Sequence, residues 1–211
     1  MTFSGLIFDL DGTLLDSLPD LTLAANVIRN RLGLEPVDAD RVRACVGDGA
    51  RKLLERLLPE ELFSDERLAQ FLAIYRQHLT DQTRPFEGIP QLLERLSGHP
   101  RALITNKPVE MAREILDRLD LARHFSVVFG GDSFPEKKPH PRPLLETLKR
   151  LGTPAATTLM IGDHHTDLYA ARAADMPFCF CRWGYGHTDG ETADFEAGSV
   201  ADLARLLGAD L

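Results

Sequence analysis

The 211-residue sequence predicts an α/β fold in which a doubly wound parallel sheet carries an inserted all-helical cap domain. Three observations support this prediction: short apolar runs recur along the chain, amphipathic helical patterns separate them, and one long interval contains helical patterns alone. Continuous apolar runs, rather than alternating ones, are typical of strands that are buried on both faces. Strands that alternate with helices form parallel sheets through right-handed crossovers.

Five apolar runs are expected to form the strands, at residues 6–8, 102–104, 127–129, 159–161 and 178–180. Between them, apolar residues recur at helical spacing and predict helices. The stripes are Leu92, Leu93 and Leu96; Met111, Ile115, Leu116 and Leu119; and Leu144, Leu145, Leu148 and Leu151. This order of strands and helices is that of a Rossmann-like core.

The interval from about residue 15 to residue 84 contains no convincing strand, only helical stripes that glycines and prolines punctuate as turns. We therefore predict a core formed by residues 1–15 and 85–211 and a helical cap domain formed by residues 16–84. An insertion placed directly after the first strand would lie over the carboxyl ends of the strands. Open parallel sheets bind their ligands at those ends.

The composition argues against several classes of protein. The formal net charge is −8 and no basic block offsets it, so the sequence does not predict a nucleic-acid-binding protein. No secretory signal or apolar run of membrane-spanning length is found, so we expect a cytoplasmic protein without a membrane partner. The cysteines, Cys45, Cys179 and Cys181, are expected to be small buried hydrophobes rather than disulfide or metal ligands.

Two carboxylates follow the first predicted strand. Asp9 and Asp11 are two residues apart, so both can face the crevice at the end of that strand. Close like charges need a cation, and two oxygen ligands suit Mg²⁺, which binds few carboxylates and keeps several waters. The alternative is a solvated turn, because calcium-binding loops and hairpin turns contain similar Asp and Gly residues. The flanking Phe8 and the residues Thr13 and Leu14 that follow make the whole pattern more specific than the two aspartates alone.

Two further loops could hold a phosphate. Thr105 and Asn106 follow a predicted strand and precede a helix start, where a hydroxyl and free backbone N–H groups can bind an anion. The alternative is that these residues only cap the helix. The prolines on both sides of His140 hold the Lys137-Lys138 segment extended, so one of the two lysines can be aimed into the crevice. There the lysine can neutralise phosphoryl oxygens, although a Lys-Lys pair is more often a solvated loop.

A fourth loop adds acidic oxygens at the same sheet edge. Asp163 and Asp167 follow the strand at residues 159–161 and can complete a metal site with Asp9 and Asp11. His164 and His165 raise the alternative of zinc or iron. Adjacent histidines on a turn are expected to diverge, and the other candidate ligands are hard carboxylates, so we favour magnesium.

Together these four loops, in this order, resemble the motifs of the haloacid dehalogenase superfamily of phosphohydrolases, and the resemblance covers nearly the whole chain. Within that superfamily the sequence is similar to the phosphoglycolate phosphatase group. The stretches that carry this similarity are residues 11–17, 46–50, 138–145 and 183–186. One departure is His164-His165, where relatives more often carry a serine and another polar residue, and this puts only local loop contacts in doubt.

The resemblance implies a role for each candidate residue. Asp9 would attack phosphorus and form an aspartyl-phosphate, and Asp11 would exchange protons with the leaving group and with water. Mg²⁺ would be held by Asp9, Asp163 and the backbone carbonyl of Asp11, with Asp167 in support. The phosphate would be bound by Thr105, Asn106 and Lys138.

The substrate must be recognised by the cap, because the core motifs bind only phosphate and metal. The candidate is the loop from Gly47 to Arg51, whose N–H groups and guanidinium could receive a small carboxylate such as that of 2-phosphoglycolate. Alternatively, these glycines merely separate two helices and Arg51 is solvated. A larger sugar phosphate, such as N-acetylmuramic acid 6-phosphate, is the competing substrate class.

The same candidate residues help to distinguish a phosphatase from other members of the superfamily. A dehalogenase needs no metal and usually lacks the second aspartate, so Asp11 and Asp163 count against it. A phosphomutase uses the same core motifs and stays open as an alternative, as does a small-molecule-binding module that has lost catalysis. The sequence does not distinguish a monomer from a dimer.

Overall fold

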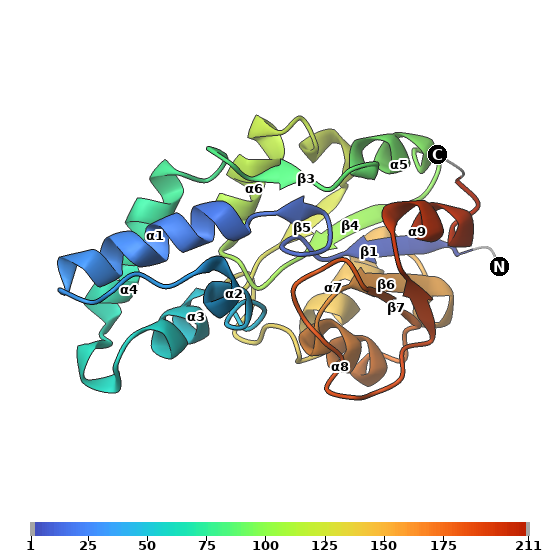
Figure 1. Ribbon diagram of the computed structural model, residues 1–211. Coiled ribbons are helices and arrows are strands. Elements are labelled where there is room, and N and C mark those ends of the chain that lie inside the picture. The colour runs from blue at the N-terminus through green and yellow to red at the C-terminus, as the bar shows by residue number, and fades with distance from the viewer. Residues whose placement is uncertain (1–2, 210–211) are drawn as a thin grey trace.

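The computed structural model describes residues 3–209, which contain a six-stranded parallel sheet with the order β5-β4-β1-β6-β7-β8 (Figure 1). The strands are β1 (Gly5–Phe8), β4 (Arg101–Ile104), β5 (Val127–Phe129), β6 (Thr158–Gly162), β7 (Phe178–Cys181) and β8 (Phe195–Ala197). The first five confirm the predicted strands. β8 was not predicted, because its short edge segment contains a glutamate and forms no apolar run.

Helices cover both faces of this sheet. Successive strand residues point to opposite faces, and in β1 Leu6 packs with one set of helices while Ile7 packs with the other. The first set is α5 (Ile89–Arg95), α6 (Val109–Arg118) and α9 (Val200–Leu206), and the second is α7 (Arg142–Leu151) and α8 (His165–Ala173). The expected stripe on α7 is wrong at Leu145, which lies on the solvent side of the helix and is 41% exposed.

Residues 16–84 form what we call the helical insertion. Its helices are α1 (Leu18–Arg31), α2 (Ala39–Arg43), α3 (Ala50–Leu57) and α4 (Asp65–Gln77). Helix α1 packs on α2 and α4, and α3 packs on α4. These helices lie beyond the carboxyl ends of the central strands (Figure 1). In the described part of the chain, three short 3₁₀ helices lie at Glu60–Leu62 in the insertion and at Ala122–His124 and Ala155–Thr157 in the core.

Two short strands join the ends of the insertion, so the expectation of no strand between residues 15 and 84 is wrong at its two limits. Strands β2 (Leu15–Asp16) and β3 (Arg84–Pro85) pair antiparallel. The junction is reinforced by the buried carboxylate of Asp20, which accepts hydrogen bonds from the backbone N–H groups of Gln82 and Thr83. The entry and the exit of the insertion are therefore held side by side.

Two expectations from composition can be compared with the structure. Cys45, Cys179 and Cys181 are buried and unpaired, as predicted. Within residues 3–209, no helix combines the length and apolar character needed to cross a membrane.

Candidate active site

Three buried carboxylates converge at the carboxyl edge of the sheet. Asp9 directly follows β1, Asp163 follows β6, and Asp167 lies in the first turn of α8. Strands β1 and β6 are paired neighbours, so the residues that follow them are brought together. One carboxylate oxygen from each of the three side chains lies within 4.8 Å of the other two. The structure thus brings together three of the four predicted metal-binding side chains.

Lys138 lies beneath this carboxylate cluster. Its ammonium donates to Asp9 Oδ1 at 2.8 Å, to Asp167 Oδ1 at 2.6 Å and to the carbonyl oxygen of Ile104 at 2.7 Å. The side chain is 1% exposed. Burial alone would lower the pKa of Lys138, but Asp167 and Asp9 outweigh burial and raise it, so the lysine stays charged. Lys138 is therefore a fixed positive charge for the cluster and not a solvated loop residue.

Asp163 is held in place by neighbouring loops. Its Oδ1 accepts a hydrogen bond of 2.8 Å from the Thr13 hydroxyl, and its Oδ2 accepts from the backbone N–H groups of Tyr185 and Gly186. Position 12 requires a glycine for two reasons. A Cβ atom there would lie 2.3 Å from Asp163 Oδ2, and the backbone φ of +84° is one that other residues rarely adopt. The loop after β1 therefore both supplies Asp9 and positions the second carboxylate.

When its three carboxylates are ionised, the cluster has more negative charge than Lys138 can compensate. Burial raises the pKa of Asp9 to about 7, and burial together with the negative charge of Asp9 raises the pKa of Asp163 to about 7. Burial also raises the pKa of Asp167. Three carboxylates carry three negative charges when ionised, and Lys138 compensates one. Hard oxygen ligands with two uncompensated charges fit a divalent cation of the Mg²⁺ class.

These raised pKa values predict how stability depends on pH in the metal-free protein. Between about pH 4, the usual aspartate pKa, and about pH 7, the folded state holds protons on Asp9 and Asp163 that the unfolded state has released. The free energy of unfolding should therefore fall as the pH rises through this window. Urea unfolding at pH 5 and pH 8 checks this, and Mg²⁺ should stabilise the protein more at pH 8. A chelated protein whose stability does not fall between these pH values would contradict the prediction.

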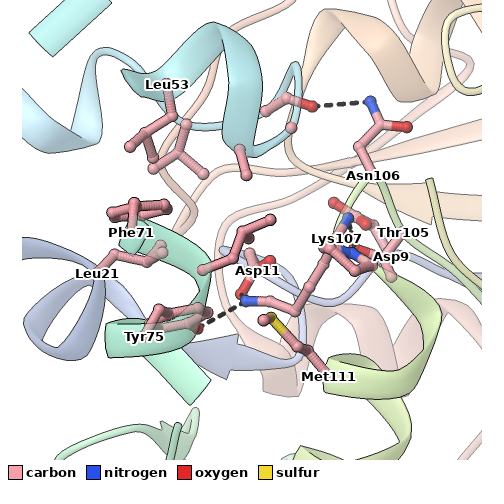
Figure 2. Close-up of a pocket in the computed structure, with 16 residues that line it drawn as sticks. Asp9, Asp11, Leu21, Leu53, Phe71, Tyr75, Thr105, Asn106, Lys107 and Met111 are labelled. Carbon is pink, nitrogen blue, oxygen red and sulfur yellow. Dashed lines mark hydrogen bonds and ion pairs between the residues drawn. The ribbon is translucent and has the colours of Figure 1, made fainter. Parts of the chain in front are cut away.

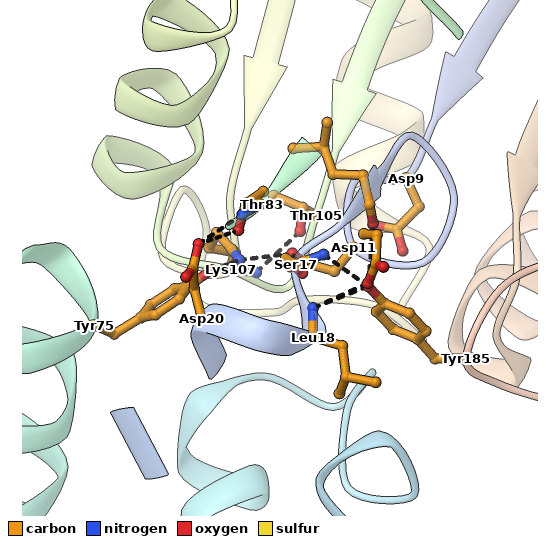
Figure 3. A network of polar contacts seen from close by, with 12 residues as sticks. Asp9, Asp11, Ser17, Leu18, Asp20, Tyr75, Thr83, Thr105, Lys107 and Tyr185 are labelled. Atoms are coloured by element: carbon orange, nitrogen blue, oxygen red, sulfur yellow. Dashed lines mark hydrogen bonds and ion pairs between the residues drawn. The ribbon is translucent and has the colours of Figure 1, made fainter. Parts of the chain in front are cut away.

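Asp11 faces the helical insertion rather than the carboxylate cluster. Its Oδ1 accepts hydrogen bonds from the Ser17 hydroxyl at 2.5 Å and from the Lys107 ammonium at 2.7 Å (Figure 3). The side chain of Asp11 is thus not the fourth carboxylate of the expected metal site. This leaves only its backbone carbonyl for the metal role that the resemblance implies.

Lys107 links Asp11 to the insertion. Its ammonium also donates to the Tyr75 hydroxyl on α4 at 2.7 Å, and its side chain is 4% exposed. Burial would lower the pKa of Lys107, but Asp11 and Tyr75 raise it. Sequence reasoning missed this residue, although the signal was present. Pro108 follows Lys107 as Pro139 follows Lys138, and a residue that precedes a proline is held extended.

A small cavity of about 50 Å³ lies between the insertion and the core (Figure 2). The insertion lines it with apolar side chains, including Leu21, Leu53 and Phe71, and the core lines it with Asp9, Asp11 and Lys107. A single water needs about 10–15 Å³ of such space. The cavity therefore has room for only a few small groups beside the carboxylate of Asp9.

Thr105, Asn106 and Gly47, which were predicted to bind phosphate or substrate, also line this cavity. The Thr105 hydroxyl accepts from the backbone N–H of Lys107 at 3.1 Å. The amide of Asn106 donates to the carbonyl oxygens of Gly47 and Lys138, both at 2.9 Å. Both amide protons of Asn106 are thus used to join the core to the insertion. In this arrangement its side chain connects two loops rather than presenting donors to a ligand.

Arg51 lies outside the cavity. Its guanidinium pairs with Asp65 at 2.6 Å and lies over the ring of Phe63, and its side chain is 48% exposed. Arg51 is not among the residues that line the cavity. Its position gives no support to the expected contact with a substrate carboxylate and agrees with the alternative of a solvated arginine.

The expectation that His164 and His165 diverge is wrong. Their ring centroids are 4.1 Å apart, and the ring of His187 lies within 6 Å of both. Atoms of His165, His187 and Asp189 lie close enough to share a metal ion, but this group is largely exposed and lies at the N-terminus of α8, whose dipole disfavours a cation. His164 caps α8, and burial and His165 lower its pKa to about 4, so its ring is neutral. The histidines thus form a loop cluster beside the carboxylates rather than part of their metal site.

Comparison with known proteins agrees with this geometry. The model of the haloacid dehalogenase-like hydrolase family matches residues 6–181. A phosphoglycolate phosphatase of Chromobacterium violaceum is 40% identical, over 95% of this chain and 94% of its own. Another, of Aquifex aeolicus, is 37% identical over 96% and 95% of the two chains. The crystal structure of a predicted phosphoglycolate phosphatase from Haemophilus somnus has a TM-score of 0.91 and 29% identity, over 98% of both chains.

The family match includes the strands and loops that supply the carboxylate cluster and its lysine. It runs from β1 to the end of β7 and contains Asp9, Asp11, Lys138, Asp163 and Asp167. The chain belongs to the haloacid dehalogenase-like hydrolase family.

Proposed function

We propose that this protein is a magnesium-dependent phosphatase that hydrolyses 2-phosphoglycolate through an aspartyl-phosphate on Asp9. That it is a phosphoric monoester hydrolase follows from its family and from the phosphatases that it resembles over almost their full length. The observation that carries the proposed mechanism is the buried cluster of Asp9, Asp163 and Asp167 around Lys138. When ionised, the cluster could hold a divalent cation, and Asp9 is its one member that lines the cavity.

In the proposed first step, an oxygen of Asp9 attacks phosphorus and the bond from phosphorus to the leaving oxygen breaks. Asp11 supplies the proton that the leaving alkoxide takes up. In the second step, water attacks phosphorus, the bond to Asp9 breaks, and Asp11 accepts a proton from that water. Both contacts of Asp11 with Ser17 and Lys107 use Oδ1. Oδ2 makes no hydrogen bond within residues 3–209, so it can exchange this proton.

Mg²⁺ would be held by Asp9, Asp163 and the backbone carbonyl of Asp11, with Asp167 in support. Bound there, the ion would neutralise charge on the phosphoryl oxygens. Lys138 would hold Asp9 and Asp167 in position through its two ion pairs. Thr105 and the backbone at Asn106 would bind the phosphate, because both lie at the wall of the cavity.

The size of the cavity supports 2-phosphoglycolate over a sugar phosphate. About 50 Å³ is far below the roughly 300–1,000 Å³ of a typical ligand pocket. A hexosamine ring such as that of N-acetylmuramic acid 6-phosphate does not fit unless the insertion moves away. The relatives from Chromobacterium violaceum and Aquifex aeolicus are both phosphoglycolate phosphatases by name.

We further infer that the insertion acts as a cap domain. Its apolar side chains line the cavity beside Asp9, so movement of the insertion would change the access of a substrate to Asp9. The linkers near residues 15–17 and 84–88 would permit that movement, while the pairing of β2 with β3 keeps the two linkers together.

A metal-controlled assay tests the proposed function. Purified protein is assayed with 2-phosphoglycolate, N-acetylmuramic acid 6-phosphate and p-nitrophenyl phosphate, with Mg²⁺ and after chelation. We expect the highest kcat/KM with 2-phosphoglycolate, and chelation should abolish turnover of every substrate until Mg²⁺ is restored. Full activity after chelation would contradict the metal site, and faster hydrolysis of the sugar phosphate would contradict the substrate assignment.

A further inference from the structure

Among the described residues that line the cavity, Lys107 contributes the one cationic side chain. Lys138 does not line the cavity, and its ammonium donates to Asp9, Asp167 and a carbonyl oxygen. Arg51 faces solvent. A second anionic group on a substrate, beyond its phosphate, therefore has Lys107 as its one cationic partner in this wall.

The hydrogen bonds of Lys107 leave donors for such a group. An ammonium has three protons, and Lys107 uses one on Asp11 and one on the Tyr75 hydroxyl. The Tyr75 oxygen accepts that bond, so its own proton stays available to an acceptor. The third proton of Lys107 and the hydroxyl proton of Tyr75 form a pair of neighbouring donors, which matches the two oxygens of a carboxylate.

The surroundings of this donor pair strengthen an ionic contact. Tyr75 is 2% exposed, and Leu21, Leu53 and Phe71 form the apolar wall nearby. Charged hydrogen bonds gain strength where water is excluded. Asp9 lines the same cavity, whose volume is about 50 Å³. A phosphate on Asp9 and an anion on Lys107 must therefore be separated by a short linker.

We propose that Lys107 and Tyr75 bind the carboxylate of the leaving group, so that the substrate class is a phosphate monoester of a short 2-hydroxy acid. The inference rests on the proposed function and deepens it by naming the residues that recognise the carboxylate of the substrate. It assigns recognition to a core lysine and an insertion tyrosine in place of Arg51. Because Tyr75 lies on α4, substrate recognition requires the insertion to be closed over the core.

The test compares 2-phosphoglycolate with ethyl phosphate, which has the same chain length but no carboxylate. The measured quantity is the ratio of kcat/KM for the two esters, in Mg²⁺, for wild type, Lys107→Met, Tyr75→Phe and the control Tyr169→Phe, a partly buried tyrosine that does not line the cavity. Lys107→Met should lower the ratio about 10- to 100-fold, the loss expected for one charge-assisted hydrogen bond. Tyr75→Phe should lower it about 3- to 10-fold, and Tyr169→Phe should leave it at the wild-type value.

Binding to the inert Asp9→Asn background separates recognition from chemistry, because Lys107 also contacts Asp11. In that background, calorimetry should show that Lys107→Met raises the Kd of 2-phosphoglycolate about 10-fold or more, with a much smaller change for ethyl phosphate. Equal losses for both esters, in turnover and in binding, would overturn the inference and leave Lys107 as a support for Asp11. If Lys107→Met does not fold, an unchanged ratio in Tyr75→Phe overturns the inference by itself. A wild-type protein that hydrolyses neither ester would instead refute the proposed function.

Discussion

Asp9→Asn is expected to lower kcat by about 10⁴-fold or more while the protein stays folded. The amide keeps the shape of the side chain but cannot attack phosphorus. Lys138 keeps Asp167 as an ion-pair partner, so the buried lysine is not left uncompensated. The carboxylate that is lost has its pKa raised to about 7 by burial, so its ionised form contributes little to stability without metal. Steady-state kinetics and circular dichroism give the two readouts.

A matched control is Asp40→Asn, because the side chain of Asp40 is 91% exposed and lies on the insertion away from the cavity. This variant should have wild-type kinetics. More than a few per cent of wild-type kcat in Asp9→Asn, in a preparation without contaminating phosphatase, would remove Asp9 from the nucleophilic role.

Lys138→Met should have the largest effect on stability. The substitution leaves Asp9 and Asp167 buried without their shared cation, and removal of one partner from a buried ion pair costs about 3–5 kcal/mol. The free energy of unfolding should fall by that amount at pH 8 in metal-free buffer. Mg²⁺ should restore part of the loss, because the ion would compensate the same carboxylates. Activity should fall about 10²- to 10³-fold, as for loss of one electrostatic stabiliser.

The exposed Lys149 provides the control for this substitution. Lys149→Met removes a surface pair with Glu146 and should change the free energy of unfolding by no more than about 0.5 kcal/mol. Urea unfolding of both variants, with and without Mg²⁺, makes the comparison. If Lys138→Met were as stable as Lys149→Met, the buried carboxylates would not depend on this lysine.

Much of the core could be predicted because its signals are local. Continuous apolar runs identified five strands, and the loops that follow β1, β4 and β6 meet because these strands are neighbours in the sheet. The convergence of Asp9, Asp163 and Asp167 follows from that topology. β8 escaped prediction because an edge strand need not be apolar on both faces.

Contacts between the insertion and the core could not be predicted, because they depend on how two packed units meet. In the sequence, Tyr75 belongs to an apolar helical stripe with Phe71 and Leu72, and only the placement of α4 brings its hydroxyl to Lys107. Arg51 was chosen because glycines precede it, yet the helical turn carries its side chain towards Asp65. Asn106 follows a strand as expected, but its partner Gly47 is 59 residues away in the chain.

Chemical trapping of the phosphorylated enzyme tests the central claim most directly. Wild-type protein is mixed with 2-phosphoglycolate and Mg²⁺, quenched during turnover, reduced with borohydride, digested and analysed by mass spectrometry. If Asp9 carries the phosphate, borohydride should reduce this residue to homoserine. The homoserine should not form without substrate, nor in Asp9→Asn. Reduction at another carboxylate, or none in samples quenched across the whole course of an active turnover, would contradict the account.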